Sequence, residues 1–205
     1  VDALCDAGLL RHDGDHPHRL FSVTPAGRDV LGEDHRAGVD YGHGHGDLTE
    51  SSLHVLAVEG ARRYLETAYV ADPDSPVTEA IPYYERDDGR RLDLVGRDAT
   101  GAVRVTVEAE RVHHDIGRAV PADYDTMAAC EPDEALWVVP TQAAGHEVLA
   151  ALNDPLEGSP RVDKTYADST PPQQFRIDTP GLTAVYPVGW LHNQIERDTI
   201  GDGAA

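Results

Sequence analysis

Residues 90–111 read RRLDLVGRDATGAVRVTVEAER, and this stretch decides the fold of the chain. In its second half, apolar residues occupy positions 103, 105, 107 and 109, and polar residues occupy the positions between them. Such alternation is typical of a β-strand with one buried face. The residues from Asp98 to Gly101 are turn formers that separate the two halves. The stretch therefore predicts a β-hairpin inside a sheet.

The segments on either side predict further strands and helices. A first strand is expected over about 77–85, where Pro82 places it at an edge or ends it early, because proline has no N–H to donate. The apolar run Ala135 to Val139 is typical of a buried strand. A last strand is expected at 182–187. Three helices are also expected: one that begins at Asp47 or Thr49 and ends near Ala68, one over about 113–130 with a break or new start near Pro121, and one over 142–153.

The N-terminal region predicts a smaller, separate unit. Leu9 to Val23 alternates on both sides of a polar turn, which indicates a short hairpin. Thr24 is suited to cap a following helix, and Pro25 stands at the first helical position, where its missing N–H is tolerated. The expected divisions are this unit at 1–36, a glycine-rich connector at 37–47, an α/β domain at 48–198 and a disordered tail at 199–205.

The charge of the chain indicates adaptation to concentrated salt. Its formal net charge is −20, from 37 acidic and 17 basic residues, and Lys164 is the only lysine. At molar ionic strength the Debye length is about 3 Å, so repulsion among exposed carboxylates is largely screened. The acids are spread along the chain instead of forming a tail, which favours the cytoplasm of an extreme halophile. DNA contacts in such salt must be short-range, and arginine's bidentate fork suits them better than lysine's ammonium.

Cysteine, histidine and hydropathy patterns exclude several classes of protein. Cys5 and Cys130 lie far apart and form no CxxC motif, so they predict neither a disulfide framework nor a zinc–cysteine site. The 11 histidines do not have the spacing of a zinc site. The chain has no apolar run long enough for a membrane span and no signal-peptide pattern, so we expect a cytoplasmic protein without a membrane partner.

The string GLLRHDGDHPHRLFSVTPAGRDVL, from Gly8 to Leu31, resembles the wing and closing helix of winged helix-turn-helix proteins. The resemblance implies double-stranded DNA as a partner, with Arg11 and Arg19 placed to contact phosphates. The helices that enter the major groove would then lie before Val1.

The rest of the chain resembles the PD-(D/E)XK nuclease fold, which implies a restriction-endonuclease-like α/β domain with a central mixed sheet. It resembles still more closely the nuclease-like domain that follows a winged helix in replication-relaxation proteins of plasmids and other mobile elements. The matching residues are His54 in the first helix, Asp93 in the hairpin, the acidic strand end VEAER at 107–111, and Tyr124 after the start of the next helix.

The hairpin turn predicts how the acidic residues face one another. If residue 97 pairs with 102, Asp93 lies opposite Thr106, and Arg91 lies opposite Glu108. Asp93, Glu108 and Glu110 then share one face. Two carboxylates in diagonal positions, roughly 7 Å apart, can hold one Mg²⁺. Such an ion would bind the scissile phosphate and lower the pKa of a bound water. Glu59 is a candidate further carboxylate from the first helix.

The sequence departs from the nuclease pattern at its third position. The active pattern ends in lysine, which stabilises developing negative charge, whereas this chain has Glu110, of the opposite sign. Arg111 points to the other face of the strand and does not replace the lysine. An alternative is that Arg91 and Glu108 form only a cross-strand ion pair among solvated acids.

Three functional hypotheses follow. The first is a DNA-binding protein of a plasmid or virus that acts in replication or its regulation, with a catalytically impaired nuclease-like domain. The second is an active Mg²⁺-dependent endonuclease in which Asp93 and Glu108 hold the metal and Glu110 or Glu59 assists. The third is a transcriptional regulator whose second domain forms a homodimer or senses a ligand.

Overall fold

A computed structural model describes residues 1–14, 19–32, 52–110 and 115–201. The contacts between residues divide the chain into two compact units, Val1–Leu56 and Ala57–Ala205, and each is described by itself. The expected connector at 37–47, the helix caps Asp47 and Thr49, and Arg111 lie outside the described residues. In the described part of the chain, no helix is long and apolar enough to cross a membrane.

The first unit contains the predicted hairpin and the helix that follows it. Its elements are α1 (Asp2–Asp6), β1 (Leu10–Gly14), β2 (Leu20–Val23) and α2 (Pro25–Leu31). β1 and β2 pair antiparallel, which confirms the hairpin. The Thr24 hydroxyl accepts a hydrogen bond from the Gly27 amide at 3.1 Å, so the predicted N-cap is confirmed as well. The sequence did not predict α1.

The second unit is built on a five-stranded sheet. Its strands lie in the order β3 (Val77–Glu85), β4 (Arg91–Asp98), β5 (Val103–Ala109), β6 (Glu134–Val139) and β7 (Ala184–Pro187). β4 is antiparallel to both neighbours, whereas β5, β6 and β7 are parallel to one another. The sheet is therefore mixed. β3 forms an edge, as Pro82 predicted.

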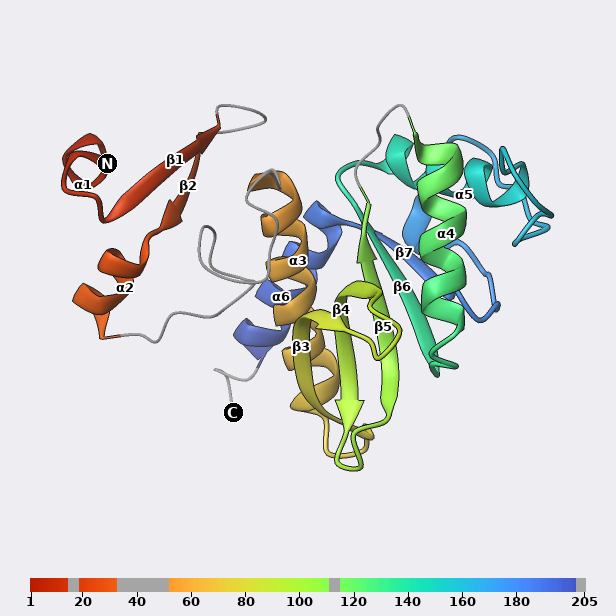
Figure 1. The fold of residues 1–205 in the computed structure, drawn as a ribbon, viewed down its shortest axis with the longest axis horizontal. Coiled ribbons are helices and arrows are strands. Elements are labelled where there is room, and N and C mark those ends of the chain that lie inside the picture. The colour runs from red at the N-terminus through yellow and green to blue at the C-terminus, as the bar shows by residue number, and fades with distance from the viewer. Residues whose placement is uncertain (15–18, 33–51, 111–114, 202–205) are drawn as a thin grey trace. The chain divides into compact units, whose positions relative to one another are not determined.

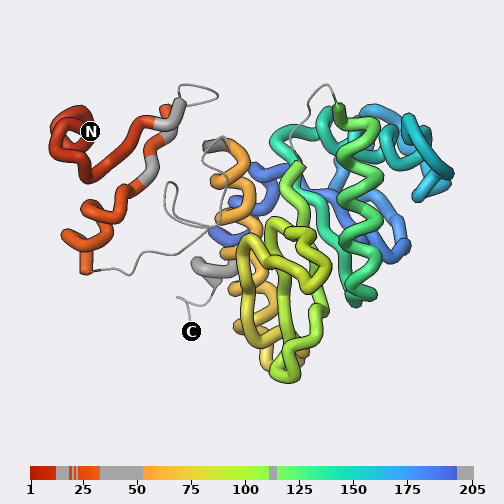
Figure 2. Tube along the Cα trace, viewed as in Figure 1, coloured from red at the N-terminus to blue at the C-terminus, as the bar shows by residue number. Residues whose placement is uncertain are grey.

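Helices cover both faces of this sheet, so the second unit is an α/β domain. The helical elements are α3 (Ser52–Leu65), the π-helical turn η1 (Glu66–Val70), α4 (Ile116–Ala128), α5 (Gln142–Asn153), the 3₁₀ turn η2 (Pro172–Gln174) and α6 (Val188–Gly201). Figure 1 shows α3 and α6 on one face of the sheet and α4 and α5 on the other. The same layers can be followed along the Cα trace in Figure 2.

The core on the α4 and α5 face is made by alternate strand residues. Val95, Ala135, Trp137 and Val185 point to this side and pack with Val120, Tyr124, Met127, Val148 and Leu152 from the helices. The indole Nε1 of Trp137 donates to the Gly181 carbonyl at 2.8 Å. Because side chains alternate along a strand, Glu108 and Thr106 on β5 belong to this same face.

Proline 121 lies inside α4 and does not break it. Its ring nitrogen cannot donate to the Gly117 carbonyl one turn earlier, so that oxygen would lose its helical partner. The Leu156 amide donates to this carbonyl instead, at 3.2 Å. The break expected near Pro121 is therefore absent within the described residues of this helix. At the C-terminal end, α6 continues to Gly201, beyond the expected end of order at 198.

The register of the β4–β5 hairpin differs from the predicted one. The turn is at Asp98–Gly101, where the Gly101 amide donates to the Asp98 carbonyl. However, Arg97 pairs with Val103 instead of residue 102. A bulge between Gly96 and Arg97 shifts the register once more, so that Gly96 pairs with Val105. Within this turn, Oδ1 of Asp98 accepts hydrogen bonds from the amides of residues 100 and 102. The sequence carried no signal for this bulge.

Candidate functional site

The corrected register places Asp93 and Glu108 directly opposite each other. Leu94 pairs with Val107, so the same register sets Asp93 on β4 against Glu108 on β5. The Asp93 carboxylate accepts a hydrogen bond from the Ala109 amide at 2.8 Å, which fixes it across the strand pair. The predicted diagonal arrangement, with Asp93 opposite Thr106, is wrong. The two carboxyl groups are closer neighbours than the sequence indicated.

The predicted pairing of Arg91 with Glu108 is also wrong. Arg91 is the strand partner of Glu85 on β3, and its guanidinium lies 5.3 Å from the centre of the Tyr83 ring. Glu108 is turned instead toward the α4 side of the sheet and is only 9% exposed. The register therefore does not set Arg91 opposite Glu108, as the predicted cross-strand ion pair requires.

Asp123 on α4 is a third acidic residue at this place. Its negative charge and that of Asp93 both act on Glu108. Asp123 was not among the acidic residues predicted from the sequence. A signal was present, because Asp123 lies three residues after Val120 and four before Met127, both fully buried. An acid within the apolar stripe of a helix indicates a special environment.

Burial and mutual repulsion change the acidity of these groups. Desolvation raises the pKa of Glu108 well above its usual value, and the charges of Asp93 and Asp123 and a hydrogen bond with Asp93 raise it further. Desolvation, followed by the charge of Asp93, raises the pKa of Asp123 from 3.8 to about 7. The cluster therefore retains protons at neutral pH when no cation is nearby.

Glu110 lies just beyond the end of β5. It is two residues after Glu108 and therefore belongs to the same face of the sheet. Its amide donates to the Val138 carbonyl at 2.9 Å, which extends the pairing with β6, and the residue is 8% exposed. In the nuclease pattern this position holds the lysine. Here a buried acid occupies it.

No contact that the structure describes links Glu59 to the cluster of Asp93, Glu108 and Asp123. Glu59 lies on α3, which covers the opposite face of the sheet from α4. Its carboxylate accepts hydrogen bonds from Arg62 at 2.8 and 2.9 Å and from Arg63 at 3.1 Å. Its role as a metal ligand stays a prediction.

The two other residues matched to the family differ in burial. His54 is partly buried in the first turn of α3. Tyr124 is 7% exposed and belongs to the core, where its ring packs so closely on Gly181 that a Cβ there would approach it to 2.6 Å. The structure thus gives Tyr124 a packing role.

The two arginines expected to contact DNA both lie in the first hairpin. Arg11 is on β1, opposite Ser22. The Arg19 guanidinium lies 3.7 Å from a carboxylate oxygen of Asp2 and 5.2 Å from the centre of the Phe21 ring, with 60% of its side chain exposed. A pair this long and exposed is weak.

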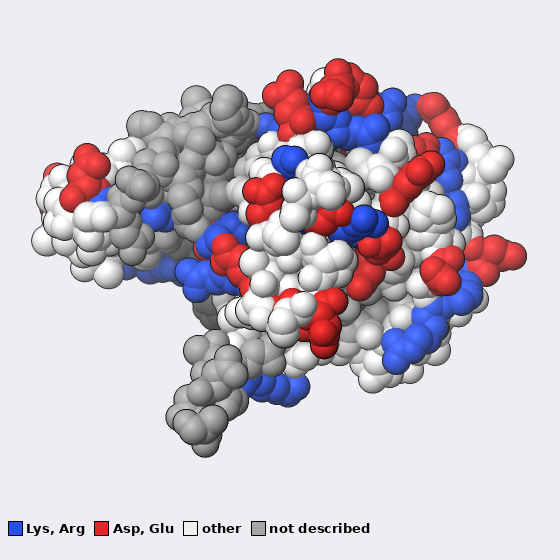
Figure 3. Space-filling view, turned by 90° about the horizontal axis from the view of Figure 1, so that it is seen from below, with Lys and Arg blue, Asp and Glu red and all other residues white. Residues whose placement is uncertain are grey.

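The acidic composition is visible on the surface. On the face drawn in Figure 3, the Lys and Arg side chains lie among Asp and Glu side chains. Phosphate contacts on this face would therefore be made by individual arginines at short range.

Among the residues that the structure describes, no three His, Cys, Asp or Glu side chains are arranged to hold a metal ion. Asp93 and Glu108 together supply two carboxylates, which are hard oxygen ligands. Mg²⁺ is commonly held by one or two carboxylates, with substrate phosphates completing its shell. The pair therefore fits Mg²⁺ in donor type and number. The two carboxylates would fill only part of the Mg²⁺ coordination shell, and water and substrate would supply the remaining ligands.

Comparisons with protein-family models, with curated proteins and with solved structures find no match for this chain.

Proposed function

We propose that this chain is a DNA-binding protein of a plasmid or virus, that it acts in the cytoplasm in DNA replication or its regulation, and that its second unit is a nuclease-like domain with impaired catalysis. The observation that carries the proposal is the Asp93–Glu108 pair on adjacent antiparallel strands. A nuclease of the PD-(D/E)XK type needs its acidic residues on these two strands. The order of helices and strands, and the mixed sheet, agree with that expectation.

The impairment follows from Glu110. In an active site of this type, a lysine ammonium stabilises the negative charge that develops on the phosphate. A carboxylate there opposes the same charge. The raised pKa of Glu108 has a second consequence, because a protonated carboxyl group is a poor metal ligand until a cation displaces its proton.

Asp93 and Glu108 are the residues that would hold a Mg²⁺ ion. When bound, such an ion supplies a Lewis acid for the scissile phosphate and lowers the pKa of a coordinated water. The residues of the chain itself perform the positioning. The Ala109 amide holds the Asp93 carboxylate, and burial excludes most water from Glu108.

DNA binding is assigned to the first unit. A hairpin between α1 and α2 agrees with a wing that is preceded and followed by helices. Arg11 and Arg19 contribute phosphate contacts from this hairpin. Because there are only two such arginines, the contacts position the protein on a duplex and carry little sequence information.

An active endonuclease is the second candidate function, and Asp123 favours it. A third carboxylate that interacts with Asp93 and Glu108 adds a proton acceptor that the sequence pattern did not include. This acceptor would titrate near neutral pH, which suits a general base. Metal-dependent nicking of DNA separates this candidate from the first.

The proposal is tested with supercoiled plasmid and with a labelled duplex in molar KCl containing Mg²⁺. We expect salt-sensitive duplex binding that Arg19→Gln weakens, and no nicking above the level of Asp93→Asn. Nicking that is lost in Asp93→Asn and in Asp123→Asn would replace the first candidate with the endonuclease. Absence of both duplex binding and nicking would refute DNA as the partner.

A further inference from the structure

A pocket of about 560 Å³ lies beside the starts of β6 and β7. Its walls come from residues 133 and 134, from the segment 173–178, from Lys164, and from the start of β7. Its volume lies within the roughly 300 to 1,000 Å³ that small-molecule sites occupy. The pocket is at the amino ends of the parallel strands, whereas Glu108 is near the carboxyl end of β5. It is thus separate from the carboxylate cluster.

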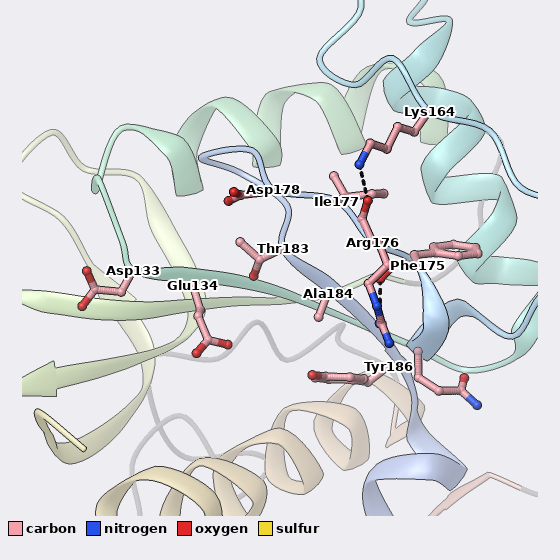
Figure 4. A pocket seen from close by; sticks show the side chains of 11 residues that line it. Asp133, Glu134, Lys164, Phe175, Arg176, Ile177, Asp178, Thr183, Ala184 and Tyr186 are labelled. Carbon is pink, nitrogen blue, oxygen red and sulfur yellow. Dashed lines mark hydrogen bonds between the residues drawn. The ribbon is translucent and has the colours of Figure 1, made fainter. Parts of the chain in front are cut away.

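One end of the pocket is cationic. Lys164, the only lysine of the chain, donates to the Arg176 carbonyl, and Figure 4 shows the Arg176 side chain pointing from this segment toward Tyr186. The Arg176 guanidinium has one long hydrogen bond, 3.4 Å to the Phe175 carbonyl, and no ion pair with a described residue. In a chain with 37 acidic and 17 basic residues, a guanidinium in a pocket without a carboxylate partner is available to an external anion.

An aromatic ring and an unsatisfied acceptor lie next to this end. Tyr186 lines the pocket and stacks on Trp190, with ring centres 4.4 Å apart and an interplanar angle of 13°. The side-chain oxygen of Gln173 is buried and has no hydrogen-bond partner among the described residues. A planar ring that carries an N–H donor would satisfy both, by stacking on Tyr186 and by donating to Gln173.

The opposite end of the pocket is acidic. Asp133, Glu134 and Asp178 lie there, across the cavity from Arg176 (Figure 4). One oxygen of Glu134 accepts from the Tyr69 hydroxyl at 2.8 Å, which fixes the carboxylate. Carboxylates accept hydrogen bonds from hydroxyl groups and repel anions. The lining therefore orients a ligand that carries an anion at one end and hydroxyl or amino donors at the other.

We propose that this pocket binds a nucleoside phosphate, with the phosphate on Arg176, the base against Tyr186 and Gln173, and the donor groups toward Glu134 and Asp178. The ligand is either a free nucleotide or the 5′-phosphorylated end of a nucleic acid strand, since both present the same groups. This site does not depend on the carboxylate cluster or on nuclease chemistry.

The test uses the full chain in molar KCl, with AMP, adenosine, inorganic phosphate and a short 5′-phosphorylated DNA strand as probes. Binding is measured by calorimetry and by tryptophan fluorescence, because Trp190 is stacked on the pocket residue Tyr186. We expect AMP or the phosphorylated strand to bind and change the fluorescence. Arg176→Gln should weaken that binding about tenfold or more, as expected for loss of a charge-assisted hydrogen bond.

Arg197→Gln is the matched control, because Arg197 is an exposed arginine on α6 whose guanidinium contacts only Gln194 among the described residues. It should leave the affinity unchanged. If AMP binds more tightly than the phosphorylated strand, the ligand is a free nucleotide. If the strand binds more tightly than AMP, the ligand is a strand end. The proposal is overturned if neither binds, if inorganic phosphate binds as tightly as both, or if the Arg176 and Arg197 variants behave alike.

Discussion

Replacing Asp123 with asparagine should stabilise the folded protein, and the gain should grow with pH. The pKa of Asp123 is raised from 3.8 to about 7 in the folded state. Between these two pH values the folded form holds a proton that the unfolded form has released, so the free energy of unfolding falls as pH rises. Asparagine does not ionise, and the variant avoids this loss. Above pH 7 the loss is complete and the gain becomes constant.

The size of the gain follows from the same pKa change. A difference of about three pH units, at about 1.36 kcal/mol each, gives roughly 4 kcal/mol at about pH 8. At about pH 5 only the part of the interval between pH 3.8 and pH 5 has been crossed, which gives roughly 1 to 2 kcal/mol. Asp123 is partly exposed and interacts with Asp93, so solvent screening reduces both figures. We expect the gain at about pH 8 to exceed that at about pH 5 by about 1 to 2 kcal/mol.

Urea unfolding followed by circular dichroism in molar KCl measures this difference at the two pH values. Asp125→Asn is the control, because Asp125 lies on the same helix but is exposed and pairs with Arg161 at 2.7 Å. The free energy of unfolding of that variant should fall by at most about 1 kcal/mol. It should show no stabilisation that grows with pH. An Asp123→Asn gain that is equal at both pH values, or a loss of stability at both, would refute the assigned environment of Asp123.

Two further predictions concern the fold as a whole. The chain should lose native circular dichroism on dialysis from molar to about 50 mM KCl, because its net charge of −20 loses its screening, and equal spectra would contradict the salt adaptation. Gly181→Ala should lower the free energy of unfolding in urea by about 1 to 3 kcal/mol, because its Cβ would lie 2.6 Å from the Tyr124 ring and carbonyl. Gly60→Ala, in a helix with no atom near its new Cβ, should be neutral or stabilising, and equal effects of the two changes would contradict the packing.

Local patterns predicted most of the elements. The alternation of residues 103 to 109 defined β5, the apolar run defined β6, and Thr24 marked the start of α2, because each depends on neighbours in sequence. Register was not predictable in the same way. It depends on a bulge at Gly96 and on the hydrogen bonds of Asp98, and each shifts the facing residues without changing the hydrophobic pattern.

The candidate site was predicted in part. Asp93 and Glu108 were named from their strand positions, but Asp123 comes from a helix brought onto the sheet by tertiary packing. The pocket beside Arg176 combines residues 133 and 134 with residues some 40 positions later, and no local pattern joins them. Such long-range associations follow from how the layers pack.

The most direct test of the nuclease-like site is thermal melting in molar KCl at about pH 8, with and without Mn²⁺ or Mg²⁺. An ion that binds only to the folded Asp93–Glu108 pair raises the free energy of unfolding by about 2.7 kcal/mol when the ion concentration is a hundredfold above Kd. This gain raises Tm by roughly 5 to 10 °C. We expect Asp93→Asn and Glu108→Gln each to abolish the rise and Asp125→Asn to keep it. No rise in the unmodified chain, or a rise that persists in both variants of the pair, would contradict a metal site there.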